Sequence, residues 1–165
     1  PYLLRELFGM ADEKLPFLNV SDGGHFENLG AYELIRRRCG VIIISYAECD
    51  PDLKFEGLAQ LIRMCRVDFD VDIDIDVSAI RGTGDSSWSA NRCAVGTIKY
   101  PDVKDKATLI YIKAAMTGRE SEAILQYKAT HPAFPHESTG NQFYGEAQFE
   151  SYRHLGREIA EQAFR

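Results

Sequence analysis

The sequence predicts an α/β fold with some parallel strands. The clearest sign is the run of residues 40–47, GVIIISYA, which is nearly continuous and β-branched, as is typical of an interior strand covered on both faces. Residues 15–20 form an earlier apolar run, and the segment 29–39 between the two runs has a helical pattern that ends on three arginines and Gly40. Strand, helix and strand in this order indicate a sheet whose ligands lie beyond the carboxyl ends of its strands.

The remaining segments extend this layer and then change in character. Apolar spacing predicts a helix over 55–66, and strict alternation predicts a strand over 69–77. We also expect a short helix over 3–10, a Gly- and Ser-rich loop over 81–91, strands over 93–100 and 108–114, a short helix over 121–127, an irregular arm over 131–141 and a terminal helix over 148–164. The chain therefore reads as one domain over 1–165, with an α/β layer over 1–115 and a helical arm over 116–165.

Composition narrows the class of protein. The chain has 165 residues, of which 45% are hydrophobic, and a formal net charge of −6, so it is expected to be globular and not to bind nucleic acid. No apolar run approaches the length of about 18 residues that a membrane span needs. Its four scattered cysteines favour a reduced compartment, the cytoplasm or the cytoplasmic face of a membrane, over secretion. Because the first residue is proline, we expect the chain to be part of a longer protein.

The stretch VSDGGHFENLG, residues 20–30, contains the main candidate site residue, Asp22. It follows the predicted strand over 15–20, and Gly23 and Gly24 behind it would let another part of the protein come close to the backbone. Two interpretations remain open from these residues alone. Asp22 is either a catalytic or ligand-orienting carboxylate, or an aspartate that starts a turn and caps the next helix.

A resemblance to a known family bears on this choice. The string SDGGHFENLG (residues 21–30), the following YELIRRRC (32–39) and the Ile-rich strand resemble the aspartate-bearing region of patatin-like phospholipases, in particular bacterial members related to cytosolic phospholipase catalytic domains. The later segments CAVGTIKYP (93–101), HPAFPHEST (131–139) and QFESYR (148–153) are similar to the carboxyl-terminal part of the same group. The resemblance covers most of the chain, and the Asp-Gly-Gly motif is its chemically specific part.

The resemblance implies a partial three-layer patatin-like domain and a lipid acyl hydrolase with a serine–aspartate dyad. In such an enzyme the serine attacks an ester carbonyl, the aspartate accepts the serine proton directly, and backbone amides stabilise the oxyanion. Asp22 matches the dyad aspartate, and Gly23, Gly24, His25 and Asn28 are the expected supporting residues. The substrate would be a lipid ester, the parent protein would be associated with a membrane, and no metal or organic cofactor would be needed.

One departure from the family is important. Its nucleophile lies in Gly-x-Ser-x-Gly, and this chain contains no such string. We therefore expect the serine and the oxyanion hole to come from an upstream part of the same catalytic domain or from a partner chain, and this chain alone to be inactive. Two alternatives remain: a non-catalytic binding or regulatory α/β module, and a nucleotide-binding α/β domain, which would lack a proper glycine fingerprint.

Other polar groups favour structural interpretations. Asp68, Asp70, Asp72, Asp74 and Asp76 alternate as on a strand, where carboxylates two residues apart are separated by about 6.6 Å, too far for several of them to share a calcium ion. We expect them to form an acidic strand face toward solvent or basic neighbours. His131, His136 and Glu137 lie in a proline-containing arm that does not favour a zinc site. Arg36–Arg38 are expected to complement a helix end.

Overall fold

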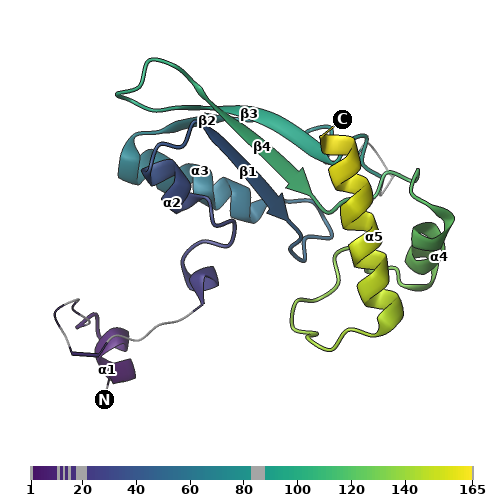
Figure 1. The fold of residues 1–165 in the computed structure, drawn as a ribbon. Helices are drawn as coiled ribbons and strands as arrows, with labels where there is room; N and C mark the ends of the chain where they lie inside the picture. The colour runs from purple at the N-terminus through teal and green to yellow at the C-terminus, as the bar shows by residue number, and fades with distance from the viewer. Residues whose placement is uncertain are drawn as a thin grey trace.

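A computed structural model of the chain describes residues 2–10, 12, 14, 16, 17, 22–82 and 88–164. Figure 1 shows its helices and strands, with the colour following the chain from purple to yellow. In chain order the elements are α1 (Tyr2–Leu7), the 3-10 helix η1 (Gly23–His25), α2 (Tyr32–Arg36), β1 (Val41–Tyr46), α3 (Glu56–Phe69), β2 (Asp72–Asp74), β3 (Cys93–Lys99), β4 (Ala107–Lys113), α4 (Glu122–Thr130) and α5 (Glu146–Ala163).

The four strands form one mixed sheet in the order β1-β4-β3-β2. β1 and β4 are parallel, with Val41 opposite Thr108 and Tyr46 opposite Lys113. β3 runs antiparallel to β4 and to β2. The predicted α/β class, with a partly parallel sheet and a carboxyl-terminal helix, is therefore confirmed. Because β1 and β4 point the same way, their carboxyl ends meet at one edge of the sheet.

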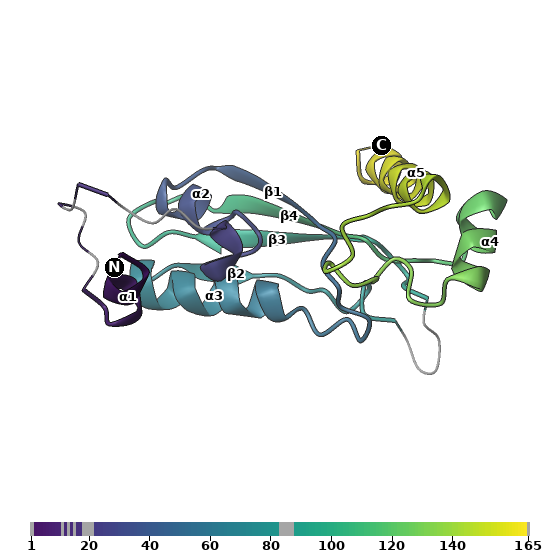
Figure 2. The same cartoon turned by 90° about the horizontal axis from the view of Figure 1, so that it is seen from below.

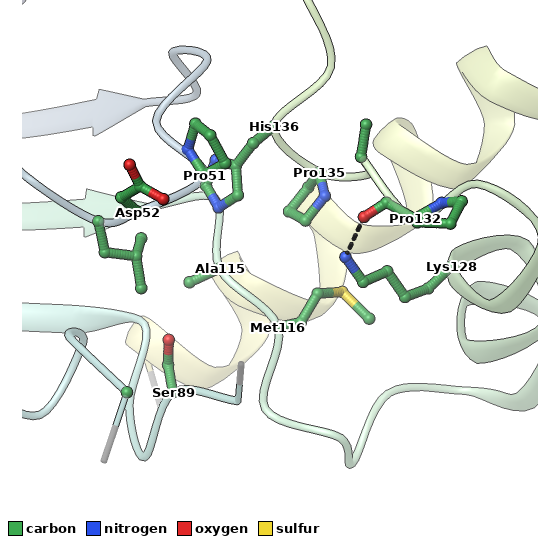
Figure 3. A pocket seen from close by; sticks show the side chains of 12 residues that line it. Pro51, Asp52, Ser89, Ala115, Met116, Lys128, Pro132, Pro135 and His136 are labelled. Atoms are coloured by element: carbon green, nitrogen blue, oxygen red, sulfur yellow. Dashed lines mark hydrogen bonds between the residues drawn. The ribbon is translucent and has the colours of Figure 1, made fainter. Parts of the chain in front are cut away.

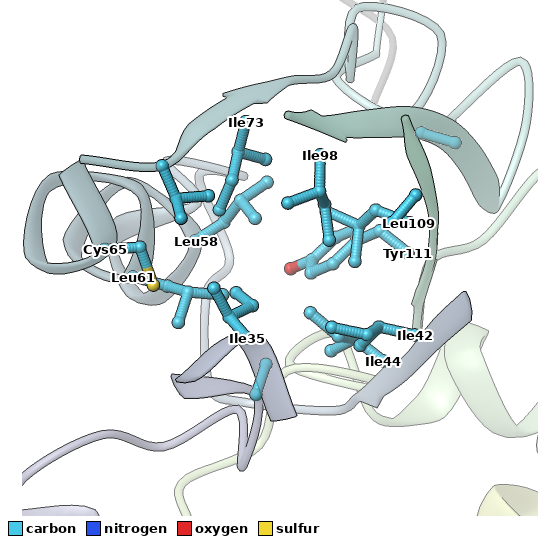
Figure 4. Packing of buried hydrophobic residues seen from close by; sticks show 14 of the residues in the cluster. Ile35, Ile42, Ile44, Leu58, Leu61, Cys65, Ile73, Ile98, Leu109 and Tyr111 are labelled. Atoms are coloured by element: carbon cyan, nitrogen blue, oxygen red, sulfur yellow. The ribbon is translucent and has the colours of Figure 1, made fainter. Parts of the chain in front are cut away.

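One face of the sheet is covered by α2 and α3, which enclose the main apolar core (Figure 4). Alternate strand residues point into this core, so Ile42 of β1 and Leu109 of β4 are buried while their immediate neighbours are more exposed. From α3 come Leu58, Leu61 and Cys65, whose spacing of three and four residues places them on one stripe of the helix. This stripe is why the segment is helical and why it packs on the sheet.

A second, smaller core lies where α4 and α5 pack together against the other face of the sheet, near the carboxyl end of β4. Leu155 and Ile159 of α5 meet Ile124 of α4 and the buried ring of Phe134, and Ile112 of β4 joins them. Figure 2 shows α5 and α3 on opposite sides of the strands, so a helical second layer covers only part of this other face. Among the described helices, none combines the length and the apolar character needed to cross a bilayer.

The partly covered face leaves apolar side chains in solvent. Val41 and Ile43 of β1 are 62% and 49% exposed, and Val95 of β3 is 68% exposed. β1 is also an end strand, and its outer edge pairs with no other strand in the described part of the chain. An apolar strand of this kind is normally covered on both faces, and open sheet edges are normally protected. We refer to Val41, Ile43, Val95 and the free edge of β1 as the open sheet face.

The predicted strand over 69–77 is wrong over most of its length. α3 continues to Phe69, whose ring centroid lies 4.8 Å from that of Tyr32, and β2 keeps only Asp72–Asp74. The contact with α2 extends the helix, and Asp70 then turns the chain with a positive φ of 54°. The alternation of apolar and acidic residues over 69–77 could not show that the helix extends to the first residue of this segment.

The acidic residues accordingly do not form one strand face. Asp68 lies on α3 and accepts a hydrogen bond from the Tyr32 hydroxyl at 2.8 Å. Asp72, on β2, forms an ion pair with Arg66 of α3. The expectation of basic neighbours therefore holds for Asp72, while Asp68 serves to join α2 to α3.

Other boundaries differ less, apart from two segments. The helix predicted over 29–39 is confined to α2, because Arg38 takes a left-handed φ of 58° and ends the helical turn. Most of the strand predicted over 15–20 lies outside the described residues, and Pro16 and Phe17, which are described, are not in a strand. Part of the predicted loop over 81–91, residues 83–87, also lies outside them. The remaining helix and strand ends agree within three residues.

Replacing either of two glycines by alanine should change the free energy of unfolding, in opposite directions. A Cβ at Gly96 of β3 would lie 2.6 Å from the Asp74 carbonyl oxygen and 2.7 Å from Ile75 Cβ, whereas a Cβ at Gly156 of α5 would meet nothing within 4 Å. We expect Gly96→Ala to lower the free energy of unfolding by about 1–3 kcal/mol through overpacking. Gly156→Ala should raise it by up to about 1 kcal/mol through helix propensity. Urea unfolding followed by circular dichroism measures both, and equal effects would contradict the packing of β3 on β2.

Candidate functional site

Asp22 stands at the amino end of η1, and its side chain is exposed. Its Oδ1 accepts a hydrogen bond from the Gly24 N–H at 3.2 Å, which closes a turn of the kind that aspartate commonly forms. Among the described residues, Oδ2 has no hydrogen-bond donor and no basic side chain pairs with the carboxylate. One oxygen therefore holds the orientation of the group, while the other can accept a proton or a hydrogen bond from outside.

Three of the predicted site residues come together around this carboxylate. A Cβ at Gly24 would lie 2.6 Å from Asn28 Oδ1 and 3.5 Å from Asp22 Oδ2. The absence of a side chain at Gly24 thus lets the Asn28 amide and the Asp22 carboxylate approach the same point of the backbone. Gly23 has open space where a Cβ would be, so its neighbourhood is accessible.

His25 is turned to the backbone and not to the carboxylate. Its Nδ1 lies 3.1 Å from the carbonyl oxygen of Asp22. A carbonyl oxygen only accepts hydrogen bonds, so Nδ1 donates in this contact. The nitrogen that a Ser-His-Asp triad would turn to the aspartate side chain is therefore used on the main chain.

The segment behind Asp22 is fixed by a residue that the sequence analysis did not single out, Glu27. Its carboxylate accepts hydrogen bonds from the N–H groups of Leu29, of Ala31 at 2.9 Å and of Tyr32 at 3.2 Å, and so satisfies the amino end of α2. Phe26 packs edge-on against the Tyr32 ring, with centroids 4.8 Å apart. An acidic residue just before a predicted helix is the signal that could have identified this cap.

A polar cluster that the sequence analysis missed lies where β1 and β4 end. Lys113, the last residue of β4, is fully buried, and its Nζ lies 3.1 Å from Glu48 Oε1 and 3.1 Å from Asp50 Oδ2. The same ammonium lies over the rings of Tyr46 and Phe55, at 5.2 Å and 5.7 Å from their centroids. A lysine at the carboxyl end of an otherwise apolar strand was the signal in the sequence, but its burial depends on the pairing of Tyr46 with Lys113.

Asp50 is held ionised in this cluster. Burial by itself disfavours the charged form, but the N–H groups of Lys54 and Phe55 donate to the carboxylate at 2.8 Å and 3.1 Å, and the Lys113 ammonium lies beside it. Together these partners outweigh burial, and the pKa of Asp50 is lowered. Glu48 accepts a further hydrogen bond from the Tyr46 hydroxyl at 2.7 Å. The cluster therefore balances one buried cation with two carboxylates.

The structure does not bring the other candidate ligands together. His131 stacks on Tyr127 with centroids 3.9 Å apart, and Glu137 accepts a hydrogen bond from Gln148 at 2.8 Å. The ring of His136 faces another partner, the Glu48 carbonyl oxygen, at 3.4 Å. In the part of the chain that the structure describes, no three His, Cys, Asp or Glu side chains gather as they would around a metal ion. All four cysteines are free.

The three consecutive arginines are paired with carboxylates. Arg36 and Arg37 both bind Glu33 of the same short helix, and these hydrogen bonds, that of Arg36 first, lower the pKa of Glu33 to about 2. Arg38 pairs with Asp102 in the turn between β3 and β4. Each of the three guanidinium groups thus has a partner within the protein.

Comparisons of the chain with protein-family models, with curated proteins and with solved structures give no match.

The Asp50 carboxylate should stabilise the fold in a pH-dependent way. Because its pKa is lower in the folded state than in the unfolded state, its contribution is fully present above the ordinary aspartate pKa of about 4 and is lost as the pH falls through the folded value. We expect Asp50→Asn to cost about 3 kcal/mol at pH 7, since Lys113 keeps only Glu48 as a counter-charge. This difference from the unaltered protein should shrink below about pH 4.

Denaturant unfolding at pH 7 and at pH 3 measures both effects. The control is Asp105→Asn, in the exposed turn between β3 and β4, which should change stability little at either pH. A loss for Asp50→Asn that is equally large at both pH values would show that the carboxylate charge is not its source.

Proposed function

We propose that this chain is the aspartate-bearing part of a patatin-like lipid acyl hydrolase, in which Asp22 is the general base for a serine outside these 165 residues. The observation that carries the proposal is the state of the Asp22 carboxylate. Its Oδ1 is held by Gly24 N–H, its Oδ2 has no donor among the described residues, and the neighbouring imidazole is turned to the main chain. This arrangement supports proton transfer directly to a carboxylate.

The proposed chemistry follows from that geometry. The serine oxygen attacks the ester carbonyl while its proton passes to a carboxylate oxygen of Asp22, and the tetrahedral oxyanion is stabilised by backbone N–H groups outside the chain. Collapse of the intermediate breaks the bond to the alcohol, which takes the proton from Asp22. A water molecule, deprotonated by Asp22 in turn, then hydrolyses the acyl-serine ester and regenerates both groups.

The open sheet face supports the same proposal over a self-contained binding module. β1 has an apolar sequence and a free edge, and Val41 and Ile43 are more than two-fifths exposed. A module that works alone would be expected to cover such a surface, because large exposed apolar patches mark interaction sites. Further strands paired on β1, with helices over the face, would complete a three-layer domain and could bring a serine near Asp22.

The test of Asp22 is the hydrolysis of a soluble nitrophenyl ester. The chain is extended upstream to a Gly-x-Ser-x-Gly, and the rate is compared with that of its Asp22→Asn variant. Loss of the general base should lower kcat/KM by about 10²- to 10⁴-fold, with the fold retained by circular dichroism. The matched control is Asp76→Asn, because Asp76 is also exposed and also accepts a backbone hydrogen bond two residues on, from Ser78 N–H at 2.8 Å.

Two results would remove the proposal. The first is activity that persists in Asp22→Asn, and the second is an upstream sequence without any such serine. In either case the binding module would be the function to pursue.

The open sheet face can be tested by complementation. The 165-residue chain alone should not hydrolyse the ester, whereas mixing it with a separately produced upstream segment that carries the serine should restore activity. Ile43→Lys, which places a charge on the open sheet face, should prevent restoration. Val67→Lys, at an 82% exposed position of α3, is the control and should leave it intact. Equal restoration by both variants would show that the partner docks elsewhere.

A further inference from the structure

A separate cavity lies beyond the carboxyl ends of β1 and β4, on the α4 side of the polar cluster. Its volume is about 360 Å³, within the range of small-molecule sites. Four parts of the chain line it: the loop after β1, Gly82 and Ser89 from the segment between β2 and β3, the residues after β4, and the end of α4 with the proline-containing arm that follows. Its lining includes Lys128 and His136, which are polar, and Met116 and Pro135, which are apolar. In Figure 3 Pro135 lies between the Lys128 ammonium and the His136 ring, and Met116 lies below Lys128.

Lys128 brings an uncompensated positive charge to this cavity. Its Nζ donates to the carbonyl oxygens of Pro132 at 2.7 Å and Phe134 at 2.5 Å, and among the described residues no carboxylate pairs with it. Burial of the ammonium lowers its pKa. Two carbonyl dipoles use two of its three N–H groups and do not cancel a full charge, so the third N–H and the charge remain for a ligand.

The other charges around the cavity are already balanced. Asp52, at the far side, pairs with Lys54 at 2.9 Å. Lys113, in the cluster behind the cavity, is balanced by Glu48 and Asp50. Of the described residues that line the cavity, Lys128 is therefore the one cation without a carboxylate partner.

His136 provides a hydrogen-bond acceptor in the same cavity. Its Nδ1 faces the Glu48 carbonyl oxygen at 3.4 Å, which places the ring proton on Nδ1 and leaves Nε2 without one. Burial lowers the pKa of the imidazole, which favours the neutral ring at pH 7. A neutral ring with a bare Nε2 accepts a hydrogen bond from a hydroxyl group, and the described part of the protein offers Nε2 no donor of its own.

We propose that this cavity binds a small organic oxyanion that also carries a hydroxyl group, such as the phosphate ester or the carboxylic acid of a short polyol. The oxyanion would bind the Lys128 ammonium, and the hydroxyl group would donate to His136 Nε2. The carbon chain between them would lie against Met116 and Pro135. Neither residue belongs to the Asp22 turn, so the site is independent of the proposed function.

The binding test uses the 165-residue chain and four probes: glycerol 3-phosphate, glycerate, inorganic phosphate and glycerol. Isothermal titration should show glycerol 3-phosphate or glycerate binding at least about tenfold more tightly than inorganic phosphate and glycerol. Glycerol lacks the oxyanion, and inorganic phosphate lacks the carbon chain that carries the second hydroxyl group. The comparison of glycerol 3-phosphate with glycerate separates the two kinds of anion. Dissociation constants above about 10 mM for both glycerol 3-phosphate and glycerate would overturn the proposal.

The matched variants are Lys128→Met and Lys104→Met. Both remove one lysine charge, but Lys104 lies in the exposed turn between β3 and β4. Lys128→Met should weaken the binding of the better probe at least about tenfold, and Lys104→Met should leave it unchanged. An equal loss in both variants would reduce the effect to net charge and would overturn the site.

A second measurement covers the case in which Lys128→Met does not fold, because Lys128 also holds two carbonyl groups of the arm. In the unaltered protein, imidazole resonances are followed by NMR during titration with glycerol 3-phosphate. The signals of His136 should shift saturably, while those of the exposed His25 should not. Unchanged His136 signals at saturating probe would overturn the proposal without any variant. Neither experiment depends on hydrolysis of the nitrophenyl ester, so its outcome is separate from the test of Asp22.

Discussion

The parallel pairing of β1 with β4 is the constraint on which most of the structure depends. It places Tyr46 opposite Lys113, so the chain leaves β1 beside a buried ammonium. A buried ammonium without counter-charges would destabilise the folded state strongly. The loop after β1 must therefore supply Glu48 and Asp50 at this point. The path of that loop is a consequence of the pairing.

The same carboxylate links the loop to the next element. Asp50 accepts hydrogen bonds from the N–H groups of Lys54 and Phe55, and Phe55 is the N-cap residue immediately before α3. The direction of α3 is thus set at the sheet edge, and its apolar stripe then falls on the sheet. The Tyr46 and Phe55 rings close over the ammonium, which joins the polar cluster to the main core.

The parts of this arrangement that are local could be predicted from sequence. The apolar run of β1 and the stripe of α3 each contain their own periodicity, and both elements lie where the sequence places them within three residues. The parts that depend on distant contacts could not. The end of α3 was missed because Phe69 is held by Tyr32, and the burial of Lys113 was missed because it depends on which strand lies beside β4.

For the site, the proximity of Asp22, Gly24 and Asn28 was predictable from one short motif, whereas the cap at Glu27 requires knowing where α2 begins.

The surroundings of Asp22 give the proposed function a physical condition. Its turn is anchored from one side, through Glu27 and Phe26 to α2, and the carboxylate itself faces solvent. A carboxylate in water is hydrogen-bonded to solvent and competes poorly for the proton of a serine, whereas a carboxylate from which water has been removed attracts that proton more strongly.

If Asp22 acts as we propose, the segment that brings the serine must also cover the carboxylate. The open sheet face would gain from the same event, because the burial of Val41 and Ile43 removes apolar surface from water. Completion of the sheet and activation of the base would then be coupled in one association step.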